Sequence, residues 1–163
     1  MDANEIKRLR RLRNKEKRLN RSHEVGGAFR FVVELDGLIV GGFSEVTGMQ
    51  SETEVKPFWE GGVNSHPHYM IEHTKYPNIV LKRGITDSSE LWEWYDSVTR
   101  GKIRRKNGSV ILNNTAGNEV CRWNFFSAFP VKWKGPDLNA TGGTVAIESI
   151  ELVHEGLKTI FKK

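Results

Sequence analysis

The segment 119–134 constrains the fold of this chain more than any other part of the sequence. Its odd positions are mainly apolar and its even positions are mixed, and a β-strand presents alternate side chains to opposite faces. The alternation predicts one long strand with two usable faces, in which Pro130 requires a sheet edge or a β-bulge. Cys121 lies on the apolar face, so we expect a buried structural thiol. Phe126 lies on the other face, where we expect a partner or a channel.

Shorter segments nearer the N-terminus also favour β-structure. Residues 29–35 alternate, and the Asp-Gly pair at 36–37 is a hairpin signal before a return strand at 38–40. The Gly-Gly pair at 41–42 indicates a bulge or a close approach of the backbone. A short apolar strand, residues 79–84, is expected to end at its glycine.

Two further strands are predicted in the C-terminal half. The Asn-Gly pair at 107–108 is a second hairpin signal and is followed by a strand at 109–113. A last long strand covers about 144–153. Its apolar alternation changes phase at Glu148 and Ser149, which we interpret as a β-bulge.

One helix is predicted within the body of the chain, at 88–100. Asp87 can cap its N-terminus, Glu90 stands at capping-box spacing, and Gly101 supplies the C-terminal stop. The positions expected to face the core are Leu91, Trp94, Tyr95 and Val98.

About six strands and one helix, without alternation of strands and helices, predict a mainly β fold. We expect two packed antiparallel sheets, as a β-sandwich or small barrel, with one flanking α-helix and a basic N-terminal helical extension. Residues 1–27 would form the extension and residues 28–163 the β domain. Edge strands could extend the sheet of a neighbouring subunit and close a barrel shared by several subunits.

The positive charge of the chain is confined to its N-terminus. The net charge is +5, and residues 1–25 alone contain nine basic and four acidic residues, which leaves the remainder neutral. The folded surface is therefore not expected to bind nucleic acid through an overall positive charge. The single cysteine excludes an internal disulfide, and no apolar run approaches the roughly 20 residues that cross a bilayer. With no apolar core of a signal peptide, we expect cytoplasmic assembly and no membrane insertion.

The extension is rich in helix-forming residues and carries a narrow apolar stripe on a basic background. An isolated helix of this length is marginal in water, so a partner would have to order it. We expect a helix that docks on a neighbouring protein, and a solvated, partly disordered arm is the alternative. A nucleic-acid-binding module that grips phosphate is a second functional hypothesis. The expected docking residues are Ile6, Leu9, Leu12 and Leu19, with Arg8 and Arg11.

Residues 49–75 form a long polar segment interrupted by glycine and proline. A loop of this length is uncommon inside a compact domain and usually carries function or contacts. It contains His66, His68 and His73, with Glu72 beside the last. A metal site would need these residues to converge, and a glycine-flanked loop preorganises ligands poorly. We therefore expect no metal, cofactor or catalytic residue, and a small metalloenzyme is the least favoured hypothesis.

Several blocks of the sequence, taken together, resemble one known family. They are FRFVVELDGLIVGGFSEVTGM (29–49), EVKPFWEGG (54–62), NIVLKRGITDSSELWEWYDSV (78–98) and WNFFSAFPVKWKGPDLNATGGTVAIESIELVHEGL (123–157). In this order the chain resembles the T4-like phage tail tube proteins. That family also supplies the inner tubes of phage-derived contractile injection systems.

The resemblance implies a structural protein without enzymatic activity or cofactor. Two packed sheets with a flanking helix would assemble as hexameric rings that stack into a hollow tube for DNA or protein cargo. The implied partners are other copies of the chain, sheath proteins and baseplate or spike proteins, within a phage tail or tail-like particle. The long segment would contact neighbouring subunits and rings through Glu60, Gly61, Gly62, Asn64, His66 and His68. The extension departs from the usual start of the family, so a specialised ring next to the baseplate is an alternative to the repeated subunit.

Overall fold

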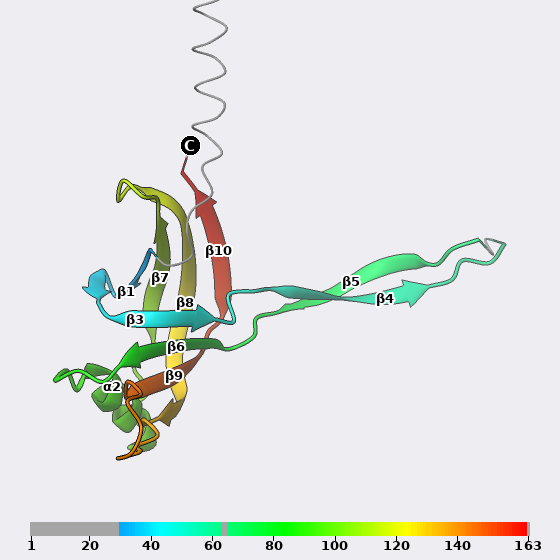
Figure 1. Ribbon diagram of the computed structural model, residues 1–163. Helices are drawn as coiled ribbons and strands as arrows, with labels where there is room; N and C mark the ends of the chain where they lie inside the picture. Colours follow the sequence, from blue (N-terminus) through cyan, green and yellow to red (C-terminus); the bar gives the residue numbers. More distant parts are fainter. Residues whose placement is uncertain (1–29, 63–64, 163) are drawn as a thin grey trace, which may run out of the picture.

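The computed structural model describes residues 30–62 and 65–162, so the predicted extension, residues 1–27, lies outside the described residues (Figure 1). The described chain contains ten strands and the helix α2. In chain order these are β1 (Phe31–Leu35), β2 (Leu38–Val40), β3 (Phe43–Thr47), β4 (Glu52–Phe58), β5 (His68–Lys75), β6 (Ile79–Gly84), α2 (Glu90–Thr99), β7 (Lys106–Asn113), β8 (Glu119–Lys134), β9 (Ile147–Val153) and β10 (Gly156–Phe161).

One hydrogen-bonded path of antiparallel strands folds over into two layers. The first sheet contains β2, β1, β7, β8 and β10, and the second contains β8, β9, β6 and β3. Figure 1 shows β3, β6 and β9 crossing the upright strands of the first sheet. The predicted mainly β fold, with two packed antiparallel sheets and one flanking helix, is confirmed.

Residues 119–134 form the single long strand that the alternation predicts. Ser127 has a positive φ of 52°, at the point where β8 passes from the first sheet into the second. A register shift follows Pro130, whose nitrogen cannot donate a ladder hydrogen bond. Cys121 is 2% exposed, and this burial raises the pKa of its thiol.

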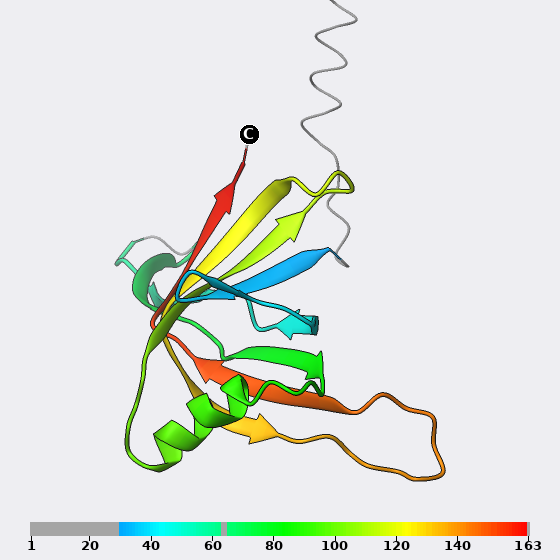
Figure 2. The ribbon, with the colours of Figure 1, turned by 90° about the vertical axis from the view of Figure 1, so that its left-hand side faces the viewer.

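The core lies between the two sheets and is closed by α2, which Figure 2 shows from its exposed side. Leu91 and Trp94 are buried as predicted, and the Trp94 indole N–H donates to the carbonyl oxygen of Arg104 at 2.8 Å. Tyr95 and Val98, predicted for the same face, are only half-buried. The largest fully buried apolar side chains of the strands are Phe125, Ile79, Leu81, Ile150, Leu152, Val33 and Val110.

The C-terminal end of α2 follows the prediction. Gly101 has a φ of 77°, in the left-handed region that favours glycine. Its N–H donates to the carbonyl of Val98, and the N–H of Lys102 donates to that of Ser97. These two bonds form the Schellman motif that ends many helices.

The N-terminal end of α2 differs from the prediction. Asp87 is not the cap, because the N-cap position is Ser89. The Ser89 hydroxyl donates to the carboxylate of Glu93, and it makes no capping bond to the backbone. The capping box with Glu90 is wrong for the same reason, since Glu90 is itself the first helical residue.

The two predicted hairpin turns have opposite outcomes. Asp36 and Gly37 have φ values of 49° and 79°, the pair of positive angles that a type I′ turn requires. The Asn-Gly pair at 107–108 lies inside β7, at a register shift, so the second turn is wrong. A Cβ on Gly108 would lie 2.2 Å from Cζ of Phe125, so this glycine makes room for a core ring.

The Gly-Gly pair at 41–42 separates β2 from β3 and does not lie within a strand. A Cβ at either position would have no heavy atom within 4 Å, so the pair serves no close approach of the backbone. The expected bulge or close contact at this pair is therefore wrong.

The change of phase near residue 148 is not a β-bulge. β9 begins at Ile147 and pairs with β6 without a register shift, and Glu148 lies on the core side with Ile150 and Leu152. Glu148 is 5% exposed and forms a buried ion pair with Arg83. A charged residue on the apolar face therefore produced the apparent break in the pattern.

The strand β10 was not predicted. It pairs with β8 over residues 156–161 and completes one edge of the first sheet. Among the residues that the structure describes, no helix has the length and apolar character needed to cross a membrane.

Candidate assembly surface

The segment 49–75 is an arm of two antiparallel strands, β4 and β5, that extends away from both sheets (Figure 1). The expectation of a loop is wrong. Nearly every residue of both strands is exposed. Polar side chains can therefore occupy both faces of the arm, and the sequence lacks the alternation of a half-buried strand.

The base of the arm is fixed to the body of the protein. Gly48 has a φ of 86°, and a Cβ there would lie 2.0 Å from the carbonyl oxygen of Asn78. On the other side, Nε2 of the buried His154 lies 3.0 Å from the carbonyl oxygen of Pro77. Contacts on both sides of the base therefore set the direction in which the arm leaves the second sheet.

The tip of the arm holds most of the predicted contact residues. Nε2 of His68 lies 3.5 Å from Oε2 of Glu60, and the rings of His66 and His68 are 5.5 Å apart. The structure thus brings together Glu60, Gly61, Gly62, His66 and His68, whereas Asn64 lies outside the described residues. Their contact with other subunits remains a prediction.

One face of the arm is apolar and uncovered. The register pairs Val55 with Ile71 and Pro57 with Tyr69, and directly opposed residues of an antiparallel pair share a face. Val55, Tyr69 and Ile71 are 49%, 65% and 77% exposed. An isolated two-stranded hairpin is marginally stable in water. We call Val55, Pro57, Tyr69 and Ile71 the apolar arm face.

The prediction from sequence missed the apolar arm face. Its signal was present in two pairs of apolar residues, at 55 and 57 and at 69 and 71, each with a spacing of two. The two pairs are placed symmetrically about position 63, six and eight residues to either side, as the two strands of a hairpin require. The surrounding polar residues and proline concealed this short alternation.

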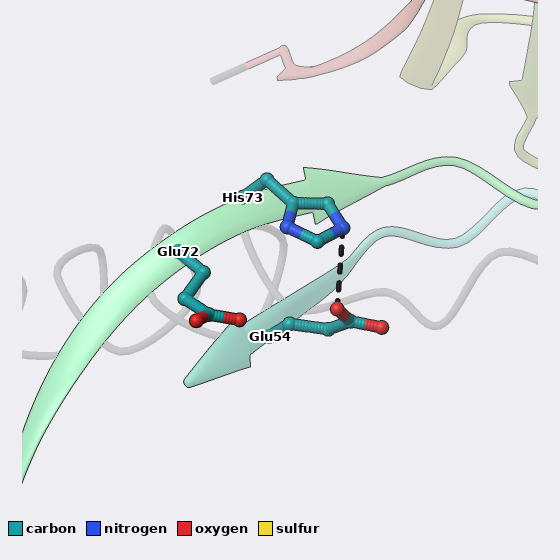
Figure 3. A group of neighbouring side chains, drawn as sticks. All are labelled: Glu54, Glu72 and His73. Atoms are coloured by element: carbon teal, nitrogen blue, oxygen red, sulfur yellow. Dashed lines mark ion pairs between the residues drawn. The ribbon is translucent and has the colours of Figure 1, made fainter. Parts of the chain in front are cut away.

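The opposite face of the arm carries a cluster of ion pairs. Nε2 of His73 lies 3.2 Å from Oε2 of Glu54 (Figure 3). The Lys75 ammonium donates to Oε1 of the same carboxylate. The hydrogen bond between Lys75 and Glu54 lowers the pKa of the carboxyl group and raises the pKa of the ammonium group. A register shift leaves Glu72 unpaired in the ladder, beside this cluster.

Three of these side chains offer atoms that could bind a metal ion. Ligand atoms of Glu54, Glu72 and His73 lie within 4.8 Å of one another. Lys75 already neutralises Glu54, and Glu72 and His73 are exposed, so ion pairing accounts for the arrangement. His66 and His68 lie at the tip, so the three histidines do not converge on one site. The absence of a bound metal remains a prediction.

The outer face of the first sheet is a second exposed surface. Phe126 is 40% exposed and pairs with Gly156 at the edge formed by β10. Farther along β8, Nη1 of Arg122 lies 3.4 Å from Oε2 of Glu34, and Nε of Arg122 lies 3.1 Å from Oε1 of Glu119. The ion pair with Glu34 connects β8 to β1, across the intervening β7. A partner or channel at Phe126 remains a prediction. The expected docking residues Ile6, Arg8, Leu9, Arg11, Leu12 and Leu19 lie outside the described residues.

Comparison with solved structures identifies close matches to this fold. A chain of the PVC sheath–tube complex of an extracellular contractile injection system, in its extended state, superimposes with a TM-score of 0.78 and 23% identity, covering 86% of this chain and 94% of that one. A chain of the anti-feeding prophage baseplate, six-fold symmetrised, matches with a TM-score of 0.74 and 26% identity, covering 84% of this chain and 96% of that one. A chain of the anti-feeding prophage tube-terminating cap matches with a TM-score of 0.78 and 23% identity, covering 86% and 93%.

A search of curated protein sequences found no match. Residues 27–158 match the family described as T4-like virus tail tube protein gp19, which accounts for most of the chain. The matching blocks in the sequence, the two crossed sheets and the flanking helix agree with this family. The chain therefore belongs to the T4-like virus tail tube protein family, whose members are structural components of phage tails and phage tail-like particles and not enzymes.

Proposed function

We propose that this chain is a subunit of the hollow inner tube of a contractile phage tail or contractile injection system. Its copies form hexameric rings, the rings stack, and the lumen conducts protein or DNA cargo. Sheath and baseplate proteins are the expected partners, since the similar chains belong to a sheath–tube complex and a baseplate.

The observation that carries this proposal is the arm formed by β4 and β5. It projects from the body with its apolar arm face exposed, although a two-stranded hairpin gains little stability by itself. Covering that face in an assembly would stabilise the assembly by about 25 cal/mol for each Å² of apolar surface removed from water. The fixed base lets every subunit present the arm in the same direction, as a closed ring requires.

A position in the ring nearest the baseplate is the second candidate. The 26% identity with a chain of the anti-feeding prophage baseplate and the basic extension favour it. A first ring has to bind a different protein on one side, and an additional docking segment would supply that contact.

Negative-stain imaging of the purified chain and of its parent particle tests the proposal. The double variant Tyr69→Ser/Ile71→Ser should lose rings and tubes while its circular dichroism stays native, because both side chains are exposed. Met70→Ser is the matched control, since Met70 is 52% exposed on the opposite face of the same strand. A monomer at high concentration, together with a particle that contains no rings of this chain, would contradict the proposal.

A further inference from the structure

A groove separates α2 from the hairpin formed by β1 and β2. It has a volume of about 480 Å³, within the roughly 300–1,000 Å³ of typical binding pockets. Leu35, Leu91 and Trp94 contribute to its lining from the core. Leu38 and Ile39, at 73% and 68% exposed, form a large apolar rim that nothing in the described residues covers.

The acidic and basic side chains that line the groove come from different elements. Glu90 and Glu93 line it from α2, a helix that contains no basic residue. Within residues 30–62 and 65–162, neither carboxylate forms an ion pair. Arg104 and Lys106 line the groove from the chain that enters β7, and the Lys106 ammonium lies 5.0 Å from the centre of the Trp94 ring. An amphipathic segment with cations beside its apolar stripe would therefore bind in one orientation, with those cations against α2.

We propose that this groove binds residues 5–19 of a neighbouring copy of the chain. At helical spacing Ile6, Leu9 and Leu12 share one face, and Arg8 flanks that face. The leucines match the exposed rim, and Arg8 matches the carboxylates of α2, which form no ion pair within the described residues.

The connection between subunits is long enough for this contact. Residues 20–29 can span roughly 33 Å when extended. The groove adjoins β2, which is an end strand of the hydrogen-bonded path and has one open edge. A neighbouring subunit that docks at this edge would lie beside the groove. The choice of a neighbouring copy as the partner depends on the proposed ring assembly. The groove and its charged residues are observed independently of that proposal.

Disulfide cross-linking of assembled protein tests the contact. One chain carries Leu9→Cys, and a second chain of different mass carries Leu38→Cys; the native Cys121 is buried and does not interfere. We expect a disulfide between position 9 of one chain and position 38 of the other, seen as a dimer of mixed mass. Leu138→Cys is the matched control for the acceptor, because Leu138 is 83% exposed but does not line the groove, and it should give no dimer.

Charge exchange tests the predicted orientation. Glu90→Lys/Glu93→Lys on the acceptor should slow cross-linking roughly tenfold, because two modest attractions become repulsions. Arg8→Glu/Arg11→Glu on the donor should restore the rate. Asp137→Lys, on the loop between β8 and β9, is the control and should leave the rate unchanged.

Each result distinguishes this inference from the proposed function. Rings without a specific cross-link overturn the inference and leave the tube function intact. The absence of both rings and cross-link overturns both. An intrachain disulfide in a Leu9→Cys/Leu38→Cys double variant diluted into excess wild-type chain shows that the segment folds back on its own subunit, which also overturns the inference.

Discussion

Nε of Arg83 lies 2.6 Å from Oε1 of Glu148, and both side chains are buried between the sheets. The indole N–H of Trp133 donates to the other oxygen of Glu148 at 3.0 Å. The guanidinium of Arg83 also donates to the carbonyl oxygen of Ser88, just before α2. This network joins β6, β8 and β9 to the start of the helix.

Removal of one member of the buried pair should destabilise the protein strongly. Arg83→Met leaves the carboxylate of Glu148 buried without its cation, which costs about 3–5 kcal/mol. The double variant Arg83→Met/Glu148→Leu should recover most of that loss, because no unpaired charge remains. Urea denaturation of the single and double variants measures both effects. Equal destabilisation by the two variants would show that the ion pair itself, and not the orphaned charge, accounts for the loss.

Trp94→Ala should reduce stability before it alters assembly. Trp94 is 4% exposed in the core, so truncation leaves a cavity that costs about 3–5 kcal/mol. We expect a lower soluble yield and a lower urea midpoint. Trp92→Ala, on the exposed side of the same helix, is the control. A stable, soluble Trp94→Ala protein that fails to form rings would assign this face to an interface.

The sequence predicted those parts of the fold in which the local residue pattern matches the burial of the side chains in the structure. The alternation across 119–134 gave β8, and positive φ values at Asp36 and Gly37 suit the residues that tolerate them. The errors occurred where long-range contacts decide the structure. Glu148 is buried only because Arg83 lies opposite, and Gly108 is needed only because Phe125 packs over it.

The arm was the larger error at the candidate site. Its hydrogen bonds join residues on both sides of a polar turn, and no buried face marks the strands in the sequence. The structure leaves Glu60, Gly61, Gly62, His66 and His68 exposed at the tip, and their contact with other subunits stays a prediction. The spacing at 55 and 57 and at 69 and 71 marks an apolar side on each strand, and the register is needed to place both pairs on the same face.

Glu119 should contribute to stability above its ordinary pKa and lose that contribution in acid. Hydrogen bonding by Arg122 lowers the pKa of this carboxyl group in the folded protein. The folded state therefore binds fewer protons than the unfolded state, and the contribution falls as the pH drops below the ordinary value of 4.5. The stability difference between wild type and Glu119→Gln should be larger at pH 7 than near pH 3. A difference independent of pH would contradict this account.

Cys121 should react with thiol reagents only when the protein opens. The thiol is 2% exposed, and burial raises its pKa, so both access and the thiolate fraction are low. In native buffer we expect negligible labelling by a disulfide reagent, and one equivalent in denaturant. An exposed cysteine introduced by Leu138→Cys provides the positive control within the same fold. Rapid native labelling of wild type would show that β8 opens locally at this position.

Removal of residues 60–68, the tip of the arm, should leave the subunit folded and prevent the stacking of rings. None of the described residues of this tip belongs to the core, so circular dichroism and the urea midpoint should remain close to wild type. The deletion removes the Glu60–His68 pair and the exposed glycine turn, which we expect to contact the next ring. Electron microscopy should show shorter tubes or single rings. The double variant Glu60→Gln/His68→Gln removes the Glu60–His68 contact but keeps the length of the arm, and so separates the two contributions. Tubes of normal length from the deletion variant would refute the role of the tip.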